Sequence, residues 1–211
     1  MSKYFANFIR VFKPGLATAK GVIEEFQSLE LDAPGLVTAT TFAPKEGGLT
    51  FVLTRVFENA SGIDAYNQAI LGASENRQNL VNDLSTKCTD TSMRISKEVR
   101  PGNYVGGSQP AYLVRNFIKV KRGYLDEAID ILSTTFDEIP DDRTKPLLSE
   151  NTTGRGNILV ISTPYETFGA AEEGWLRVRA MAQTTRGQRL LEITEESVRI
   201  PSIILHSTLT V

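Results

Sequence analysis

Apolar and polar positions alternate in several short stretches of the chain, and helical spacing follows some of these stretches. Tyr4–Phe12 is rich in β-branched and aromatic residues and ends at a Lys-Pro-Gly turn, which predicts a first strand. Residues 16–29 then show a period typical of an amphipathic helix. Its predicted apolar face carries Leu16, Ala19, Ile23 and Phe26, and its predicted polar face carries Glu24, Glu25 and Gln27.

The rest of the first half predicts a hairpin, a longer helix and a strand. Residues 36–42 and 49–57 read as strands joined by a segment with paired glycines, which can supply positive φ in a turn. Ser61 and Asp64 approximate a capping box, so we expect the second helix to begin there. Residues 92–99 predict a last strand, and the Gly- and Pro-containing segment after it predicts a linker.

The second half repeats this order. Tyr112–Val120 predicts a strand and residues 125–136 a helix, followed by strands at 147–152 and 157–163. The order β-α-β-β-α-β therefore occurs twice, which is the ferredoxin-like unit. We predict an α+β fold with two such repeats, residues 1–105 and 106–211, packed sheet to sheet in one chain as a pseudo-dimeric α+β barrel.

Matched residues in the two halves favour an internal duplication. Asn7, Phe8 and Ile9 recur as Asn116, Phe117 and Ile118 at an offset of 109 residues, and Arg10 recurs as Lys119. The pair Phe57-Glu58 recurs as Tyr165-Glu166 at an offset of 108 residues, and the motif at 92–95 recurs at 197–200. Two related halves can close against each other and enclose a cavity.

The motifs NFIKVKRGYLDEAIDIL at 116–132 and ILVISTPYETF at 158–168 carry a family resemblance. With the repeated order, they resemble the dimeric α+β barrel superfamily, which includes the antibiotic-biosynthesis monooxygenases, the EthD-like proteins and the NIPSNAP proteins. The resemblance covers nearly the whole chain and implies that both sheets of the barrel come from one chain. The resemblance supplies no catalytic motif that can be transferred to this chain. Proteins of this superfamily carry out many different reactions, so the resemblance is specific for fold and weak for function.

The amino-acid composition limits the kinds of binding partner that we expect. The 211 residues hold 23 Lys plus Arg against 25 Asp plus Glu, a balance that gives no electrostatic reason to expect nucleic acid or an anionic membrane. No window approaches a membrane span, and the N-terminal segment lacks the pattern of a secretory signal. The single Cys88 cannot form an internal disulfide. We expect a cytoplasmic protein that forms a homo-oligomer.

Strand alternation sorts side chains between the two faces of each predicted sheet. In Tyr112–Val120, the side with Tyr112, Val114 and Ile118 suits burial under helices, and the other side mixes aromatic and cationic groups. If the mixed sides line the barrel, its cations need an anionic partner, from the protein or from a ligand. The expected ligand-binding residues are Arg10, Arg55, Arg115, Lys119, Phe8, Phe51 and Phe117.

Four further kinds of residue are candidates for a functional role, and each also has a structural interpretation. His206 is the candidate catalytic residue or haem ligand, although it has no assignable partner in the sequence. Glu58 and Glu166 precede predicted helices, where the helix dipole favours a carboxylate with or without chemistry. Cys88 lacks an evident activating base. Trp175 reads as a core or subunit-contact residue.

Two functions remain open at this point. The first is a small-molecule protein, or an enzyme that needs no metal or nucleotide, whose interior holds an apolar acidic ligand. The second is a non-catalytic assembly module with a filled barrel. We expect no cofactor and no metal site, because the sequence lacks nucleotide-binding loops and has too little His and Cys for an ordinary zinc site.

Overall fold

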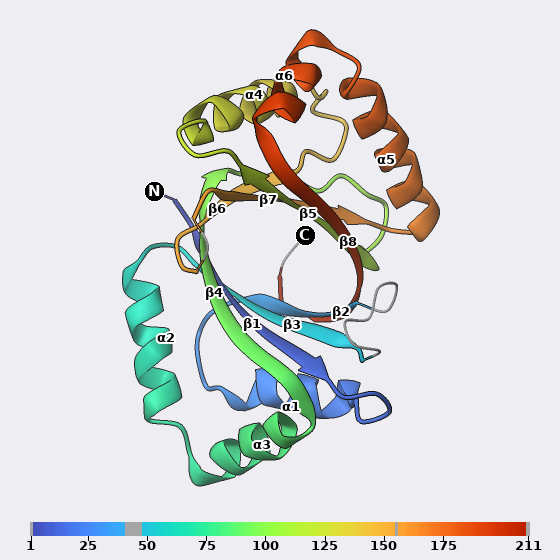
Figure 1. The fold of residues 1–211 in the computed structure, drawn as a ribbon. Coiled ribbons are helices and arrows are strands. Elements are labelled where there is room, and N and C mark those ends of the chain that lie inside the picture. The colour runs from blue at the N-terminus through green and yellow to red at the C-terminus, as the bar shows by residue number, and fades with distance from the viewer. Residues whose placement is uncertain (1, 41–47, 155, 210–211) are drawn as a thin grey trace. The chain divides into compact units, whose positions relative to one another are not determined.

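The computed structural model describes residues 2–40, 48–154 and 156–209 (Figure 1). Its element order is β-α-β-β-α-α-β, and the same order then repeats. This is the predicted order with one change, because two consecutive helices stand where one long helix was expected. Origin by internal duplication stays a prediction.

The elements of the described residues fall into two runs of seven. The first run is β1 (Tyr4–Phe12), α1 (Ala19–Ser28), β2 (Gly35–Thr40), β3 (Thr50–Phe57), α2 (Ser61–Leu71), α3 (Glu75–Thr86) and β4 (Cys88–Arg100). The second run is β5 (Tyr112–Val120), α4 (Leu125–Asp137), β6 (Leu147–Asn151), β7 (Ile158–Tyr165), α5 (Phe168–Met181), α6 (Thr185–Ile193) and β8 (Thr194–Ser207). Hydrogen bonds link the strands in the closed order β1-β3-β2-β8-β5-β7-β6-β4.

The chain forms two compact units. Unit 1 contains the residues up to Lys97 together with the segment that begins at Ser202, and unit 2 runs from Glu98 to Pro201. Strands β4 and β8 therefore each pass from one unit into the other. The division differs from the predicted one at 1–105 and 106–211, since the end of β8 belongs with unit 1.

In unit 1, helices α1 and α3 lie side by side and cover one face of the sheet (Figure 1). Strand β1 pairs antiparallel with both β3 and β4, and β2 pairs antiparallel with β3 and with the end of β8. The core under these helices consists of Phe12, Val22, Phe26, Val37, Ala39, Phe51, Leu53 and Leu84.

In unit 2, β7 lies between β5 and β6 and pairs antiparallel with both. Helices α4 and α6 contribute side chains to a core on one face of this sheet. That core consists of Ile118, Val120, Ala128, Leu132, Phe136, Leu148, Leu159, Leu190 and Ile193.

Local hydrogen bonds explain where the helices begin. Thr18 caps α1, because its side-chain oxygen accepts from the Gly21 N–H at 3.2 Å, so the helix begins three residues later than predicted. The predicted capping box at Ser61 is wrong. The N-cap of α2 is Ala60, which makes no side-chain cap, and the Ser61 hydroxyl donates to Asn59 Oδ1.

The predicted long second helix is divided near Gly72. The Gly72 N–H donates to the Gln68 carbonyl at 2.8 Å and ends α2. Ser74 then caps α3 by accepting from the Arg77 N–H at 3.4 Å. The break redirects the chain and brings α3 beside α1.

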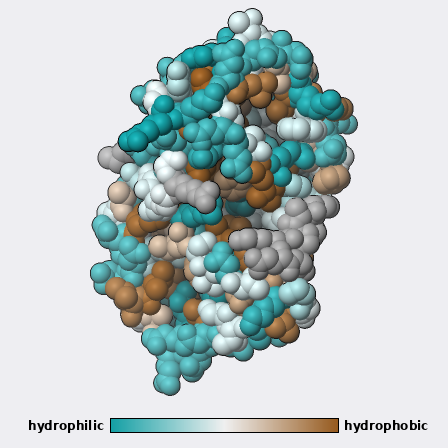
Figure 2. All heavy atoms as spheres, in the orientation of Figure 1, coloured by the Kyte–Doolittle hydropathy of each residue, from teal (hydrophilic) through white to brown (hydrophobic). Residues whose placement is uncertain are grey.

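Hydrophilic side chains cover much of the surface in the view of Figure 2, with apolar areas between them. None of the helices in the described part of the chain is long and apolar enough to cross a bilayer. Most of the hairpin turn predicted at 43–48 lies outside the described residues.

Candidate functional site

The strand register decides which face each predicted site residue occupies. Tyr4 of β1 lies opposite Phe57 of β3, and Tyr112 of β5 lies opposite Tyr165 of β7. Tyr112 follows Tyr4 by 108 positions, and Tyr165 follows Phe57 by the same number. The repeated Asn-Phe-Ile motif instead predicts an offset of 109. A shift of one residue moves every side chain to the other face. The expectation that Arg10 and Lys119 occupy equivalent positions is therefore wrong.

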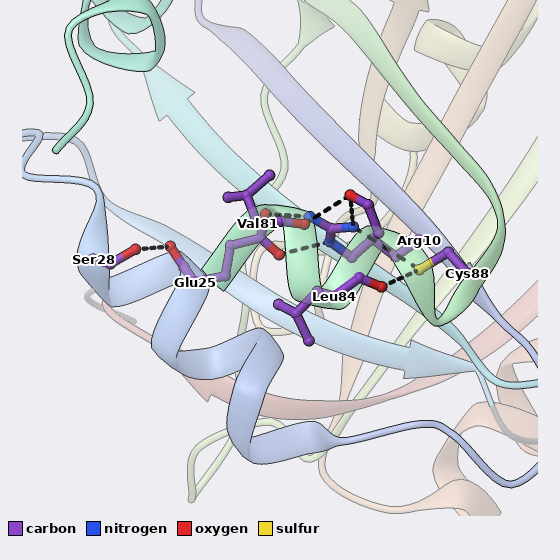
Figure 3. A network of polar contacts seen from close by, with 7 residues as sticks. Arg10, Glu25, Ser28, Val81, Leu84 and Cys88 are labelled. Atoms are coloured by element: carbon purple, nitrogen blue, oxygen red, sulfur yellow. Dashed lines mark hydrogen bonds and ion pairs between the residues drawn. The ribbon is translucent and has the colours of Figure 1, made fainter. Parts of the chain in front are cut away.

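Arg10 lies under helix α1, where it forms a buried ion pair (Figure 3). Its Nε donates to one Glu25 carboxylate oxygen at 2.6 Å and its Nη2 to the other at 2.7 Å. Its Nη1 donates to the Ser85 hydroxyl at 3.1 Å. The exposed fractions are 0% for Arg10 and 2% for Glu25. Desolvation lowers the pKa of Arg10, but the hydrogen bonds and charge of Glu25 outweigh it, and the pKa is raised above its ordinary value.

The other predicted ligand-binding residues of unit 1 also pack under its helices. Phe51 belongs to the core, and Phe8 packs against that core. Arg55 donates to the Phe26 carbonyl in the last turn of α1 and to the Ala33 carbonyl after the helix, and its guanidinium lies 3.7 Å from the centre of the Phe26 ring. Burial lowers the pKa of Arg55. The expectation that this side of the unit 1 sheet lines an interior is wrong, because it is the side that the helices cover.

In unit 2 the predicted faces agree with the structure. Ile118 and Val120 belong to the helix-covered core, so Arg115, Phe117 and Lys119 lie on the opposite face of the sheet. We call this surface the Arg115 face and define it by the residues of β5 and β7 that share it: Leu113, Arg115, Phe117, Lys119, Ile158, Val160, Ser162 and Pro164. Three of the predicted ligand-binding residues thus lie in one row.

Burial makes Arg115 the unusual member of this face. Only 8% of the residue is exposed, and its neighbours Leu113 and Val160 are also buried. Desolvation lowers the pKa of Arg115 to about 10. Lys119, further along the strand, forms an ion pair with Glu195 of β8, in which the two side chains are 40% and 39% exposed. An ion pair so exposed contributes little stability.

Sequence reasoning missed a hydroxyl-rich surface in unit 1. Thr38, Thr40, Thr54 and Ser202 are buried. The Thr40 and Ser202 hydroxyl groups lie 2.9 Å apart, and the Thr54 hydroxyl donates to Asn7 Oδ1 at 2.9 Å. The signal was the alternation Val-Thr-Ala-Thr at 37–40, which places one threonine set on the face opposite the helices.

The remaining single candidates occupy structural positions. His206 pairs with Val37 in the sheet, and its ring meets the Phe26 ring edge-on at 5.6 Å. Its role in catalysis or haem binding stays a prediction. The Cys88 thiol donates to the Leu84 carbonyl at 3.2 Å, and burial raises its pKa more than the nearby Arg10 lowers it.

Glu58 and Glu166 differ in their contacts. Glu58 pairs with Lys3 at 3.2 Å on the surface. Glu166 accepts from the Ser108 backbone N–H at 2.9 Å and from the Tyr104 hydroxyl at 3.3 Å. Hydrogen bonds from the backbone of Ser108 and then Gly107 lower the pKa of Glu166. The carboxylate thus fastens the segment between β4 and β5 to the end of β7.

An open groove of about 660 Å³ lies in unit 2, away from the predicted site residues. It is lined by Glu127, Ile131, Thr135, Glu138, Met181, Thr184, Thr185, Arg186 and Arg189. Its charges pair with one another, Arg189 with Glu127 at 2.7 Å and Arg186 with Glu138 at 2.9 Å. These ion pairs join α4 to α6 and leave the groove with balanced charge.

No three His, Cys, Asp or Glu side chains form a group that could hold a metal ion within residues 2–40, 48–154 and 156–209. The described part of the chain does hold buried cations and buried hydroxyl groups. Of these, the Arg115 face combines a buried cation with aromatic and aliphatic surface.

No family model matches the chain, and no curated protein sequence matches it. Several solved structures share its fold. A "Putative monooxygenase" from Fusobacterium nucleatum is 12% identical with a TM-score of 0.63, and 97% of this chain covers 93% of that one. An anthrone oxidase-like protein is 13% identical with a TM-score of 0.63, and the shares covered are 98% and 92%.

Chlorite dismutase from Candidatus Nitrospira defluvii, solved in complex with imidazole, is 14% identical with a TM-score of 0.60. The alignment covers 97% of this chain and 91% of that one. The resemblance to EthD-like and NIPSNAP proteins is not confirmed by these neighbours, which belong to the dimeric α+β barrel superfamily. At these identities the likeness shows the fold: this chain has the α+β barrel fold of those proteins.

Proposed function

We propose that this protein binds a small apolar molecule with an acidic group on the Arg115 face. The observation that carries the proposal is Arg115 itself, a cation that is 8% exposed on a face it shares with Leu113, Phe117 and Val160. Arg115 also interacts within the chain. An anionic ligand would add to those interactions and offset the desolvation that lowers the arginine pKa to about 10.

The rest of the face sets the shape of the ligand. Phe117 stands two residues from Arg115 on the same side of β5 and supplies a surface for an aromatic ring. Lys119 lies four residues from Arg115, about 13 Å along an extended strand. A second acidic group at the far end of a long ligand would meet Lys119 in competition with Glu195.

The fold neighbours support small-molecule chemistry without identifying it. Their printed names are "Putative monooxygenase", anthrone oxidase-like protein and chlorite dismutase, and the last was solved in complex with the small molecule imidazole. If this protein is an enzyme, Arg115 would stabilise negative charge that develops on the bound molecule, because a preorganised cation is most effective away from water. The alternative is a non-catalytic assembly module.

Binding of aromatic carboxylates, each beside its neutral primary amide, tests the proposal by calorimetry and thermal shift. We expect the parent protein to bind a carboxylate better than its amide. Arg115→Met should weaken carboxylate binding by about 1.5–3 kcal/mol, the range for hydrogen bonds to charged groups. Lys119→Met should weaken the binding only of those ligands that carry a second acidic group far from the first.

Arg122→Met is the matched control, because Arg122 is an exposed arginine in the turn after β5. It should leave carboxylate affinity unchanged. Circular dichroism and thermal unfolding verify that each variant is folded. Equal carboxylate affinities for the parent and Arg115→Met would refute the proposal and leave the assembly module as the better reading.

A further inference from the structure

Strand β6 places two further polar side chains beside the Arg115 face. Ser149 of β6 lies opposite Val160 of β7, and Val160 lies opposite Phe117 of β5. Paired residues of antiparallel strands point to the same side of a sheet, so the Ser149 side chain points to the side of Phe117. Asn151 stands two residues further along β6 and therefore points to that side as well.

Both side chains are more than nine-tenths buried, yet the chain does not use their polar atoms. Ser149 is 3% exposed and Asn151 is 8% exposed, whereas Leu148 between them belongs to the helix-covered core. Within residues 2–40, 48–154 and 156–209, neither polar side chain forms a hydrogen bond, and the polar atoms of both keep some access to solvent. Buried polar groups in proteins nearly always have a partner, so these two are available to a partner from outside the chain.

The polar groups stand on opposite sides of an apolar strip. Arg115 and Lys119 form a cationic side on β5, Val160 and Ile158 of β7 form the strip, and β6 supplies a hydroxyl group and an amide on the far side. Adjacent strands lie about 4.8 Å apart, so roughly 10 Å separates the backbones of β5 and β6. An aromatic ring on the strip would have cations along one edge and neutral hydrogen-bonding groups along the other.

We propose that the ligand of the Arg115 face is a hydroxylated aromatic acid, whose hydroxyl group Ser149 and Asn151 recognise. This inference rests on the proposed function, because Arg115 holds the acidic group in both. A neutral hydroxyl group suits β6 better than a second acid does, since serine and asparagine offer hydrogen bonds and no positive charge. The hydroxyl group can donate to the Asn151 amide oxygen and accept from the Ser149 hydroxyl, whereas an unsubstituted ring leaves both side chains without a partner.

Two pairs of acids test this inference by calorimetry: benzoate beside para-hydroxybenzoate, and the longer cinnamate beside para-hydroxycinnamate. In at least one pair, the parent protein should bind the hydroxylated acid about 3–10-fold more tightly, the gain expected for one neutral hydrogen bond. Ser149→Ala and Asn151→Leu should each bind the two acids of that pair with nearly equal affinity. Arg115→Met should weaken the binding of both acids alike.

Ser133→Ala is the matched control, because Ser133 lies in α4, on the helix-covered side of the same sheet. It should keep the preference that the parent shows for the hydroxylated acid. Circular dichroism verifies that each variant is folded.

Neutral amides distinguish this inference from the function on which it rests. A parent that prefers benzoate and cinnamate to their amides, but binds both acids of each pair equally, would overturn the inference and leave the proposed function standing. A parent that binds no acid better than its amide would overturn both. The inference is also wrong if Ser149→Ala and Asn151→Leu keep the full preference, or if they weaken both acids of a pair alike.

Discussion

Arg10 and Glu25 illustrate how a buried charge pair constrains a protein without adding much net stability. Removing two charges from water costs several kcal/mol per ion, and the pair recovers this only through its hydrogen bonds. Arg10 satisfies that condition, since it donates to both carboxylate oxygens and to Ser85 (Figure 3). Together with Ser85 of α3, the pair fixes how α1 and α3 sit on β1, because Glu25 comes from α1 and Arg10 from the strand.

Arg10→Met should therefore destabilise the protein, by about 3–5 kcal/mol, because it leaves the buried Glu25 carboxylate without its partner. Urea unfolding followed by circular dichroism measures the loss. The double variant Arg10→Met/Glu25→Leu is the control and should recover most of the stability, since replacing both charges by apolar groups is often nearly neutral. A double variant as unstable as the single one would contradict this account.

The same residues show what the sequence could reveal at this scale. Glu25 was predicted on the polar side of its helix, yet it is buried with Val22 and Phe26. Positions 22, 25, 26 and 29 do have helical spacing, so the face could have been found one position away from the predicted stripe. The partner of Arg10 could not, because it depends on a contact between residues 15 positions apart.

At the scale of single elements, the close approach of neighbouring backbone segments limits which side chains a position can accommodate. A Cβ added at Gly35 would lie 2.1 Å from the Thr54 carbonyl oxygen and 3.1 Å from the Phe26 ring. Gly35 begins β2 and pairs with Arg55 of β3. The absence of a side chain there allows α1, β2 and β3 to meet.

Gly35→Ala should lower the free energy of unfolding by about 1–3 kcal/mol, the usual cost of forcing extra atoms into a packed region. Gly156→Ala is a matched control, because a Cβ at Gly156 meets nothing within 4 Å. Thermal denaturation of both variants compares them directly. Similar melting temperatures for the two would show that β2 can shift to make room.

Element order was predictable because hydrophobic period and turn residues act locally. β1 and β5 have the predicted bounds, Tyr4–Phe12 and Tyr112–Val120. The division of the second helix was also present in the sequence, in Gly72 and Ser74, which are a common helix stop and a common cap. The repeat could not predict which side chains of β1 face the helices. The Asn-Phe-Ile motif repeats at an offset of 109 residues, whereas the strand pairing repeats at 108.

At the scale of the whole molecule, the two shared strands couple the units. β4 and β8 continue through the boundary without a loop, so unfolding either unit disturbs strands that the other needs. The sole Trp175 lies in unit 2 and the sole Cys88 in unit 1, which gives each unit its own probe.

We expect Trp175 fluorescence and Cys88 labelling by a thiol reagent to report one urea transition with the same midpoint, as for a two-state protein. Separate midpoints would show that each unit unfolds alone. A Cys88→Ser chain followed by fluorescence controls for any effect of the labelled thiol on stability.

The crossing of β8 between units was outside the reach of sequence reasoning. The repeat predicts halves that are continuous in the chain, whereas residues 203–207 pair with β2, more than 160 positions earlier. Such pairing depends on the whole fold. The β5 residues of the Arg115 face were predictable because they alternate within one strand, which is local information.

This crossing has a consequence for synthesis on the ribosome. Strand β2 is among the first parts made, but its pairing partner in β8 leaves the ribosome only after unit 2 has been translated. At about 5–20 residues per second, the edge of β2 waits roughly 10–30 s with its backbone groups unpaired. During that interval the nascent chain presents an open strand edge of the kind that favours aggregation, and unit 2 has time to fold before unit 1 is complete.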